Sequence, residues 1–331
     1  MKKKVLAVIL TVFMSCQSAI VYAGELEEVF SDPGIESVEE EVVEDEFTDG
    51  EIQFDTEENE ETSEELINDG EEIPDVEDTE ENVYPAEENY LIYGDFTYTV
   101  SNDQVTVRGY KGSATTIEVP EQIDGKTVVG VGERSFENCT FLEEITLPEG
   151  LEYIGYDFIR GTNIKRIEIP SSVKRVGEYY VLNQGALDGA QALEEVIFSE
   201  GMKEIPSYIC SNREKNTALK KVVIPDSVEK LGEYAFYNCS GINELDLGKK
   251  INMIGKRAFG NCTGLEKITF NQKMNSVTIG TEAFLGCSSL RNVILPSGVK
   301  SIESEAFENC TFLEEITLPE GLEYIGYDFI R

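Results

Sequence analysis

The sequence predicts a repeat solenoid of about eight rungs of parallel β-strand, with short turns or 3-10 segments on the return side. Three observations support this fold class. One apolar pattern recurs from residue 142 to the end of the 331-residue chain, at intervals of 22 to 29 residues. Within each unit, apolar and polar residues alternate as they do along a half-buried strand. A single unit of this size cannot bury its apolar face, whereas a stack of units buries it continuously.

Residues 1–23 are expected to be a signal peptide rather than part of the fold. Lys2, Lys3 and Lys4 precede a run of ten apolar residues, and a small-residue motif ends at Ala23. Ten residues are too few for a bilayer span, which takes about 20. Cys16 leaves a lipoprotein anchor as an alternative, but the residues before it match a lipidation signal poorly. The mature chain is therefore expected to be exported, with no membrane insertion after cleavage.

Residues 24–88 are expected to be a disordered acidic spacer. The chain has 65 Asp and Glu against 27 Lys and Arg, and residues 24–90 hold 30 of the acids with no Lys or Arg. Charge repulsion and scarce apolar surface keep such a segment extended. Diffuse cation binding is the alternative, although no EF-hand spacing occurs. The acidity argues against nucleic acid or anionic lipid as a partner, because both need basic surface.

Residues 92–135 are expected to form an N-terminal β cap, because an open end would expose the apolar core of the solenoid. Residues 97–110 predict a β-hairpin, and residues 116–120 with 128–132 imitate one rung. Further along, residues 177–192 and 206–218 replace the usual return turn and are predicted to be insertions.

Residues 136–331 are expected to form the leucine-rich rungs, the last of them truncated. A proline such as Pro148 follows the strand and ends its ladder, because proline lacks an N–H. An Ala-Phe pair such as Ala235-Phe236 fills the interior on the return side. A glycine lies between the proline and the Ala-Phe pair, and we expect a turn with positive φ at this position. It recurs at Gly155, Gly177, Gly232, Gly255, Gly280 and Gly326. The units begin at Leu142, Ile164, Leu193, Leu219, Ile242, Leu265, Leu290 and Leu313.

The repeat L-x-x-I-x-L-P-x-x-V-x-x-I-G-x-x-A-F-x-x-C resembles the BspA-like class of bacterial leucine-rich repeats over about 240 residues. The chain departs from the pattern in the irregular rungs at 154–219. The resemblance implies a right-handed leucine-rich repeat superhelix, secreted or displayed at the surface of a bacterium. It also implies adhesion to a protein or glycoprotein ligand on host or neighbouring cells, and it supplies no catalytic residues.

Catalysis within the repeats is not expected. The chain has no His, which excludes Ser-His-Asp and Cys-His catalysis and every His-containing zinc site. Its carboxylates fall on solvent-facing repeat positions without a pocket-forming pair. We therefore expect no enzyme activity, no cofactor and no metal site.

A ladder of buried thiols is expected inside the rungs. The shared repeat position needs a small residue, and stacked Cβ vectors one rung apart disfavour disulfides. No C-x-x-C motif suggests a metal site. Cys210 lies in the second insertion and is the best candidate for a reactive thiol. The ladder residues are Cys139, Cys239, Cys262, Cys287 and Cys310.

The outward side chains of the first strands are expected to form a concave binding face. Two columns, which start at Glu143 and Glu144, carry charges whose sign nearly alternates from rung to rung. This alternation favours a ladder in which each charge is neutralised by its neighbours on the adjacent rungs. A third column is less polar, so its Ile and Val residues reflect either β-propensity or a contact surface. The candidate partner-binding residues of this column are Thr146, Glu168, Ile197, Val223, Asp246, Thr269, Ile294 and Thr317.

Residues 136–160 recur without change at 307–331. The other repeats share only the apolar frame, so the identity indicates a recent duplication or a sequence assembly error. Because the chain also stops partway through a rung, we expect a fragment of a longer protein. Three functions fit: a surface-displayed adhesion module; a substrate- or wall-targeting region of a larger exported enzyme, with catalysis beyond residue 331; or a structural spacer in a surface layer.

Overall fold

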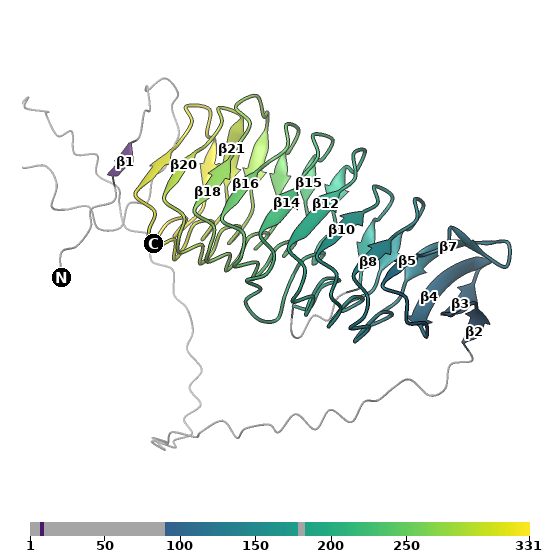
Figure 1. Ribbon diagram of the computed structural model, residues 1–331. Coiled ribbons are helices and arrows are strands. Elements are labelled where there is room, and N and C mark those ends of the chain that lie inside the picture. Colours follow the sequence, from purple (N-terminus) through teal and green to yellow (C-terminus); the bar gives the residue numbers. More distant parts are fainter. Residues whose placement is uncertain (1–6, 10–89, 178–182) are drawn as a thin grey trace, which may run out of the picture. The chain divides into compact units, whose positions relative to one another are not determined.

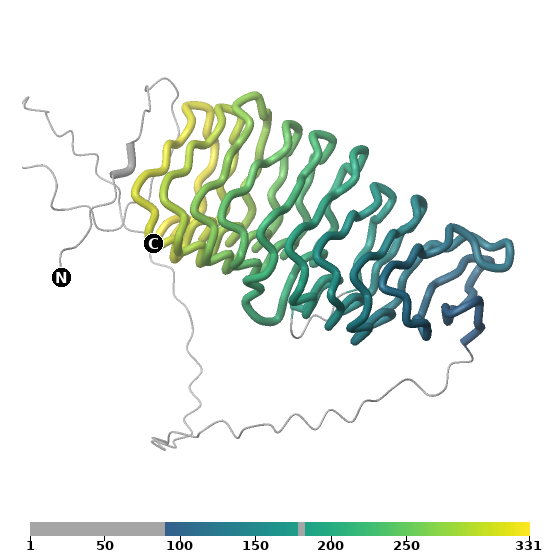
Figure 2. The backbone as a smooth tube through the Cα atoms, in the orientation of Figure 1, coloured from purple at the N-terminus to yellow at the C-terminus, as the bar shows by residue number. Residues whose placement is uncertain are grey.

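The computed structural model describes residues 7–9, 90–177 and 183–331. In this part the chain winds into a solenoid of parallel strands, without a helix among the described residues. The rungs follow one another in sequence order from the cap to residue 331 (Figure 1, Figure 2). This confirms the predicted β-solenoid. The predicted signal peptide and acidic spacer lie outside the described residues, apart from β1 (Ala7–Ile9), which pairs in parallel with β22 (Glu315–Thr317).

The first strand of each rung buries one side chain and directs its neighbours outward. In β8 (Glu144–Thr146), Ile145 is buried between two exposed residues. Successive side chains of a strand point to opposite sides, so every second residue reaches the core. We call the outward side of these strands the first-strand face. Its other members are β5 (Thr116–Glu118), β10 (Arg166–Ile169), β12 (Glu195–Phe198), β14 (Lys221–Val223), β16 (Glu244–Asp246), β18 (Lys267–Thr269), β20 (Asn292–Ile294) and β22.

A second strand in each rung follows the proline turn and forms another wall of the solenoid. In β9 (Tyr153–Ile154), Ile154 is fully buried and Tyr153 is partly exposed. We call the outward side of these strands the second-strand face. Its other members are β7 (Lys126–Val131), β11 (Arg175–Val176), β13 (Glu204–Ile205), β15 (Lys230–Leu231), β17 (Met253–Ile254), β19 (Val277–Ile279), β21 (Val299–Ile302) and β23 (Tyr324–Ile325).

The backbone ladders of the two walls are interrupted at different rungs. First-strand ladders join β5 to β8, β10 through β14, and β16 through β22, with breaks between β8 and β10 and between β14 and β16. The second-strand ladder breaks between β11 and β13. At each break the other wall stays paired, through β9–β11, β15–β17 and β10–β12. Neighbouring rungs are therefore joined by at least one ladder throughout.

In the N-terminal cap, antiparallel strands join the edge of the parallel ladder of the solenoid. It contains β2 (Leu91–Tyr93), β3 (Phe96–Ser101), β4 (Gln104–Tyr110) and the short β6 (Gln122–Ile123). The pairing of β3 with β4 confirms the predicted hairpin, and its turn residues Asn102 and Asp103 have φ of 51° and 63°, as a type I′ turn requires. On its other edge β4 pairs in parallel with β7. One antiparallel strand pair thus leads directly into the solenoid.

Stacked phenylalanines fill the return side of the regular rungs. Phe236, Phe259, Phe284 and Phe307 are at most 1% exposed. Successive rings lie 5.3, 5.3 and 5.0 Å apart between centroids, with interplanar angles of 4°, 10° and 9°. Near-parallel rings at this separation are offset, which is a favourable arrangement for two π systems. The predicted interior position of the Ala-Phe pair is confirmed.

The repeated glycines are required for close approach and not for positive φ, so the prediction of positive φ is wrong. A Cβ added to Gly155 would lie 2.2 Å from the backbone N of Glu133 in the preceding rung. Positive φ occurs instead at non-glycine residues such as Tyr234 (54°) and Asn238 (62°). Asn is among the residues that tolerate this region best. The same close approach to the preceding rung occurs at Gly177, Gly232, Gly255, Gly280 and Gly326.

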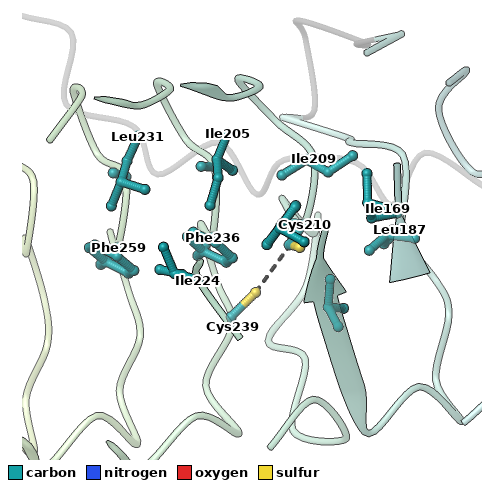
Figure 3. Close-up of a cluster of buried hydrophobic side chains, with 14 of the residues drawn as sticks. Ile169, Leu187, Ile205, Ile209, Cys210, Ile224, Leu231, Phe236, Cys239 and Phe259 are labelled. Carbon is teal, nitrogen blue, oxygen red and sulfur yellow. Dashed lines mark hydrogen bonds between the residues drawn. The ribbon is translucent and has the colours of Figure 1, made fainter. Parts of the chain in front are cut away.

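The two predicted insertions keep the core positions filled. In the first, Ala186 and Leu187 occupy the place of the Ala-Phe pair. In the second, Ile209 and Cys210 do so, and all four residues are at most 2% exposed. Figure 3 shows Leu187, Cys210 and Phe236 following one another along the core. The insertions therefore alter the surface of these rungs and leave the apolar stack continuous.

Candidate functional site on the first-strand face

The candidate partner-binding residues lie in one column along the first-strand face. Each occupies the same position in its strand, and the parallel register places them opposite one another from rung to rung. The breaks in the ladder divide this column into three parts, because register is defined only within a paired sheet. The registered pairs are Glu168 with Ile197, Ile197 with Val223, Asp246 with Thr269, and Ile294 with Thr317, while Thr146 pairs with Glu118 of β5.

The apolar members of the column differ in exposure. Ile294 is 62% exposed, the third highest value among the exposed large hydrophobic side chains of the described chain. Ile197 and Val223 are half-buried, since they pack against each other within a continuous sheet. The column therefore offers one prominent apolar side chain on β20 and a flatter apolar pair on β12 and β14.

The predicted charge ladder forms in part of the face. Glu195 Oε2 lies 3.3 Å from Arg166 Nε, and Glu195 Oε1 lies 2.6 Å from Lys221 Nζ. Nearer the C-terminus, Arg291 Nη1 lies 3.8 Å from Glu314 Oε1. No ion pair between described residues joins the strands themselves across either break, although Asp226 and Lys249, in the turns after β14 and β16, pair across the second one. The predicted ladder is therefore confirmed at these pairs and not along the whole face.

The second-strand face carries ion pairs between adjacent rungs at β9–β11, β13–β15 and β21–β23, which sequence reasoning missed. Lys174 beside Glu152 holds the pKa of that carboxyl below its ordinary value, first through a hydrogen bond and then through its charge. Opposite charges at one repeat position of neighbouring units were the available signal. The pairs are Glu152–Lys174 (2.7 Å), Lys203–Glu229 (2.9 Å), Glu204–Lys230 (2.8 Å) and Lys300–Glu323 (2.8 Å).

A groove of about 850 Å³ lies over the first break in the first-strand ladder, between β8 and β10. Its β8 wall carries Glu143, Glu144 and Glu149, and its β10 wall carries Lys165, Arg166 and Glu168. The last backbone hydrogen bond before the break runs from the N–H of residue 163 to the carbonyl of residue 142, at 2.9 Å. The sequence predicted neither the break nor the groove, because both strands match the repeat.

A second hollow of about 450 Å³ lies beside the second insertion, above a network of buried charges. Asp188 Oδ2 accepts a hydrogen bond from Arg213 Nε at 3.0 Å. Burial and then the charge of Asp157 raise the pKa of Asp188 to about 6. Asp157 is fully buried, and its Oδ2 lies 3.4 Å from Arg160 Nη1 and 3.5 Å from Arg134 Nε. These charges hold one another across the irregular rungs.

The thiol ladder is confirmed, and its hydrogen bonds explain the choice of cysteine. All six cysteines of the described chain are free and buried. Cys239 Sγ donates to the carbonyl of Cys210 at 3.1 Å (Figure 3). Cys262 Sγ donates to the carbonyl of Phe236 at 3.1 Å, and the thiols of Cys287 and Cys310 donate to Phe259 and Phe284 in the same way. Four of the five ladder thiols thus bond the preceding rung. The prediction of a reactive Cys210 is wrong, because this residue is fully buried in a core position and burial raises the pKa of its thiol.

Within residues 7–9, 90–177 and 183–331, no cluster of three or more acidic or cysteine side chains is arranged to hold a metal ion. No helix with the length and apolar character of a membrane span occurs in that same part of the chain.

The parallel rungs, their repeated apolar frame and the ladder of buried thiols place this chain in the class of leucine-rich repeat solenoids. The family model described as "BspA type Leucine rich repeat region" matches six copies over residues 110–215 and 209–330, which is more than half of the chain. The chain therefore belongs to the BspA-type leucine-rich repeat family, as the sequence resemblance implied. No curated protein matches it.

Several solved structures are similar in fold. A leucine-rich repeat protein of T. pallidum is 22% identical, with a TM-score of 0.36, and the match covers 71% of this chain and 85% of that one. A leucine-rich cell surface protein of Faecalibacterium prausnitzii is 18% identical, with a TM-score of 0.33 and coverage of 70% and 95%. The pneumococcal vaccine antigen PcpA is 17% identical, with a TM-score of 0.30 and coverage of 71% and 86%.

Proposed function

We propose that this chain is a non-catalytic protein-binding module, exported and displayed at a bacterial cell surface, where it adheres to a protein or glycoprotein of host or neighbouring cells. Membership of the BspA-type family supports the proposal. One observation carries it. The second-strand face carries ion pairs between adjacent rungs at β9–β11, β13–β15 and β21–β23, whereas the first-strand face keeps an exposed column and an open groove.

The column has the composition of a contact surface. Ile294 is 62% exposed, and Ile197 and Val223 add a second apolar area within the charged rows of the face. Burying such side chains against a partner is favourable by about 25 cal/mol per Å² of apolar surface. An apolar centre with a charged rim is the usual anatomy of a protein interface.

The location at the cell surface rests on the predicted leader at residues 1–23. In this proposal the acidic segment 24–88 sets the distance between the solenoid and the point of attachment, because a chain of like charges is extended. The second possible role, targeting of a downstream enzyme, would use the same face and would leave the binding chemistry unchanged.

The test measures binding of the full mature chain to an array of purified extracellular proteins and glycoproteins by biolayer interferometry. Ile294→Lys is expected to weaken a saturable interaction by about tenfold or more, since a buried apolar anchor becomes a charge. Met253→Lys is the matched control, because Met253 is 39% exposed on the second-strand face. Equal effects of both variants would contradict a specific face. The absence of any saturable ligand would favour a structural spacer.

A further inference from the structure

The groove over the first break is a place where opposite charges of the first-strand face do not pair. Within the sheet β10–β12–β14, Glu195 contacts both Arg166 and Lys221. Between β8 and β10, which lie next to each other along the face (Figure 1), no ladder forms and no ion pair joins the described side chains of the two strands. The glutamates of the β8 wall and Lys165 therefore do not neutralise one another.

The two walls of the groove differ in charge, because the β8 wall carries only acids, whereas the β10 wall carries Lys165 and Arg166 beside Glu168. On the β8 wall, Glu143 and Glu149 have no cationic partner among the described residues, and Glu144 accepts a hydrogen bond from Thr116 Oγ1 at 3.4 Å. On the β10 wall, Lys165 forms no ion pair with a described residue, Arg166 pairs with Glu195, and Glu168 accepts a hydrogen bond from Ser199 Oγ at 3.0 Å. By contrast, Glu195 occupies the same repeat position as Glu144 but lies inside a paired sheet, where it contacts two cations.

We propose that this groove binds an extended segment of protein in which a Lys or Arg stands two residues from an Asp or Glu. The inference rests on the proposed function and names the chemistry of its partner. The cationic side chain would meet Glu143, Glu144 and Glu149, and the acidic side chain would meet Lys165. A segment with acids alone is repelled by the β8 wall, and one with bases alone is repelled by Lys165.

The dimensions of the groove fit such a segment. Side chains two residues apart in an extended chain point to the same side and are separated by about 6.6 Å, whereas paired strands lie about 4.8 Å apart. A segment that runs along the solenoid axis therefore places its two charges over neighbouring rungs whose ladder is open. The groove volume of about 850 Å³ is within the range of ligand pockets, about 300–1,000 Å³. Its apolar base is formed by Ile145, Leu147 and Pro170.

The experiment uses the full mature chain and four fluorescently labelled nine-residue peptides of Gly and Ser. These carry Lys-Gly-Glu, Glu-Gly-Lys, Lys-Gly-Lys or Glu-Gly-Glu at the centre, and binding is followed by fluorescence anisotropy. One or both of the mixed peptides are expected to bind saturably and more tightly than either single-sign peptide. Because residues 24–90 are strongly acidic, the Lys-Gly-Lys peptide also reports non-specific attraction to that segment.

Variants assign the binding to the groove. The triple variant Glu143→Gln/Glu144→Gln/Glu149→Gln is expected to weaken the mixed peptide about fivefold or more, since three exposed charge pairs are lost. Lys165→Gln is expected to remove the preference for the mixed peptide over the Lys-Gly-Lys peptide. Glu314→Gln/Glu315→Gln is the matched control, because it changes the same repeat positions at β22, outside the groove.

Mixed peptides that bind no better than the Lys-Gly-Lys peptide, or that are unaffected by the triple variant, would overturn the proposal for the groove. The proposed function fails separately. If Ile294→Lys abolishes binding of an array protein while the groove variants do not affect it, the binding face stands and the groove proposal is wrong. If neither set of variants alters any saturable interaction, both are wrong.

Discussion

Residues 136–160 and 307–331 share one sequence but occupy two different rungs of the solenoid. The first copy is covered by the rung that starts at Ile164, and the second copy is the last rung of the described chain. Their early residues are buried alike, as Phe136 and Phe307 at 0% exposure show. Their later residues differ, because Ile154 is 0% exposed and Ile325 is 41% exposed. The burial of a repeat residue is thus determined by the next rung as much as by its own sequence.

The largest expected effect of this difference is on packing. Ile154→Ala is expected to lower the free energy of unfolding by about 2–5 kcal/mol, whereas Ile325→Ala should cost about 1 kcal/mol or less. Urea denaturation followed by two probes measures both, because long repeat arrays can depart from two-state unfolding. Equal losses from the two variants would mean that the second copy is as well packed as the first.

The glycines of the two copies are expected to behave alike. A Cβ on Gly155 would lie 2.2 Å from the backbone N of Glu133, and one on Gly326 would lie 2.3 Å from that of Ser304. Both clashes involve the preceding rung, which both copies have. Gly155→Ala and Gly326→Ala are therefore each expected to cost about 1–3 kcal/mol in denaturation experiments. A cost confined to Gly155 would show that the last rung shifts freely to admit the methyl group.

The tyrosines of the second strands should give a smaller difference. Tyr153 donates a hydrogen bond through its hydroxyl to Glu133 Oε1, and burial followed by this hydrogen bond raises the pKa of Tyr153. Tyr324, its counterpart, is 50% exposed. Tyr153→Phe is expected to cost about 1–2 kcal/mol, because it removes a hydrogen bond to a charged group, and Tyr324→Phe about 0.5 kcal/mol or less. Loss of one high-pH step from the tyrosine absorbance titration in Tyr153→Phe alone would support this assignment.

The cysteines of the two copies are expected to show no difference in the native protein. Cys139 and Cys310 are 8% and 6% exposed, and burial raises the pKa of both thiols. A thiol reagent should label neither within minutes in the folded chain, and should titrate about six thiols per mature chain after denaturation without reductant. Two or no thiols after denaturation would indicate disulfides and contradict the ladder. Rapid labelling of Cys310 alone would place the last rung among locally opening segments.

The sequence was sufficient to predict the strands and the apolar stack, because both follow from a periodic pattern that each unit repeats. Ile145 and Phe236 lie where the period places them. Gly155 was expected to adopt positive φ, although a glycine is needed there because a Cβ would meet the backbone of Glu133 in the preceding rung. Cys210 was interpreted as part of an insertion, although it fills a core position. The errors therefore concern contacts between rungs, about which one unit of sequence carries no information.

The candidate face could be predicted, but its divisions could not. The alternation of strands places Ile197, Val223 and Ile294 outward, and the structure confirms this orientation. The groove depends on a missing ladder between β8 and β10, and both strands match the repeat. The ion pairs of the second-strand face were detectable as opposite charges one unit apart. The network of Asp157 and Asp188 involves four successive rungs, two of them with insertions, so no period indicates it.

The offset breaks in the two walls have a mechanical consequence. A force along the solenoid axis loads the rung junctions in series, so the weakest junction decides where the rod fails. A junction that lacked both ladders would be such a point. The first-strand wall is open at β8/β10 and β14/β16, and the second-strand wall at β11/β13, so that every junction keeps a paired wall. Because the breaks of the two walls are staggered, an axial force meets a backbone ladder at every junction of the described solenoid.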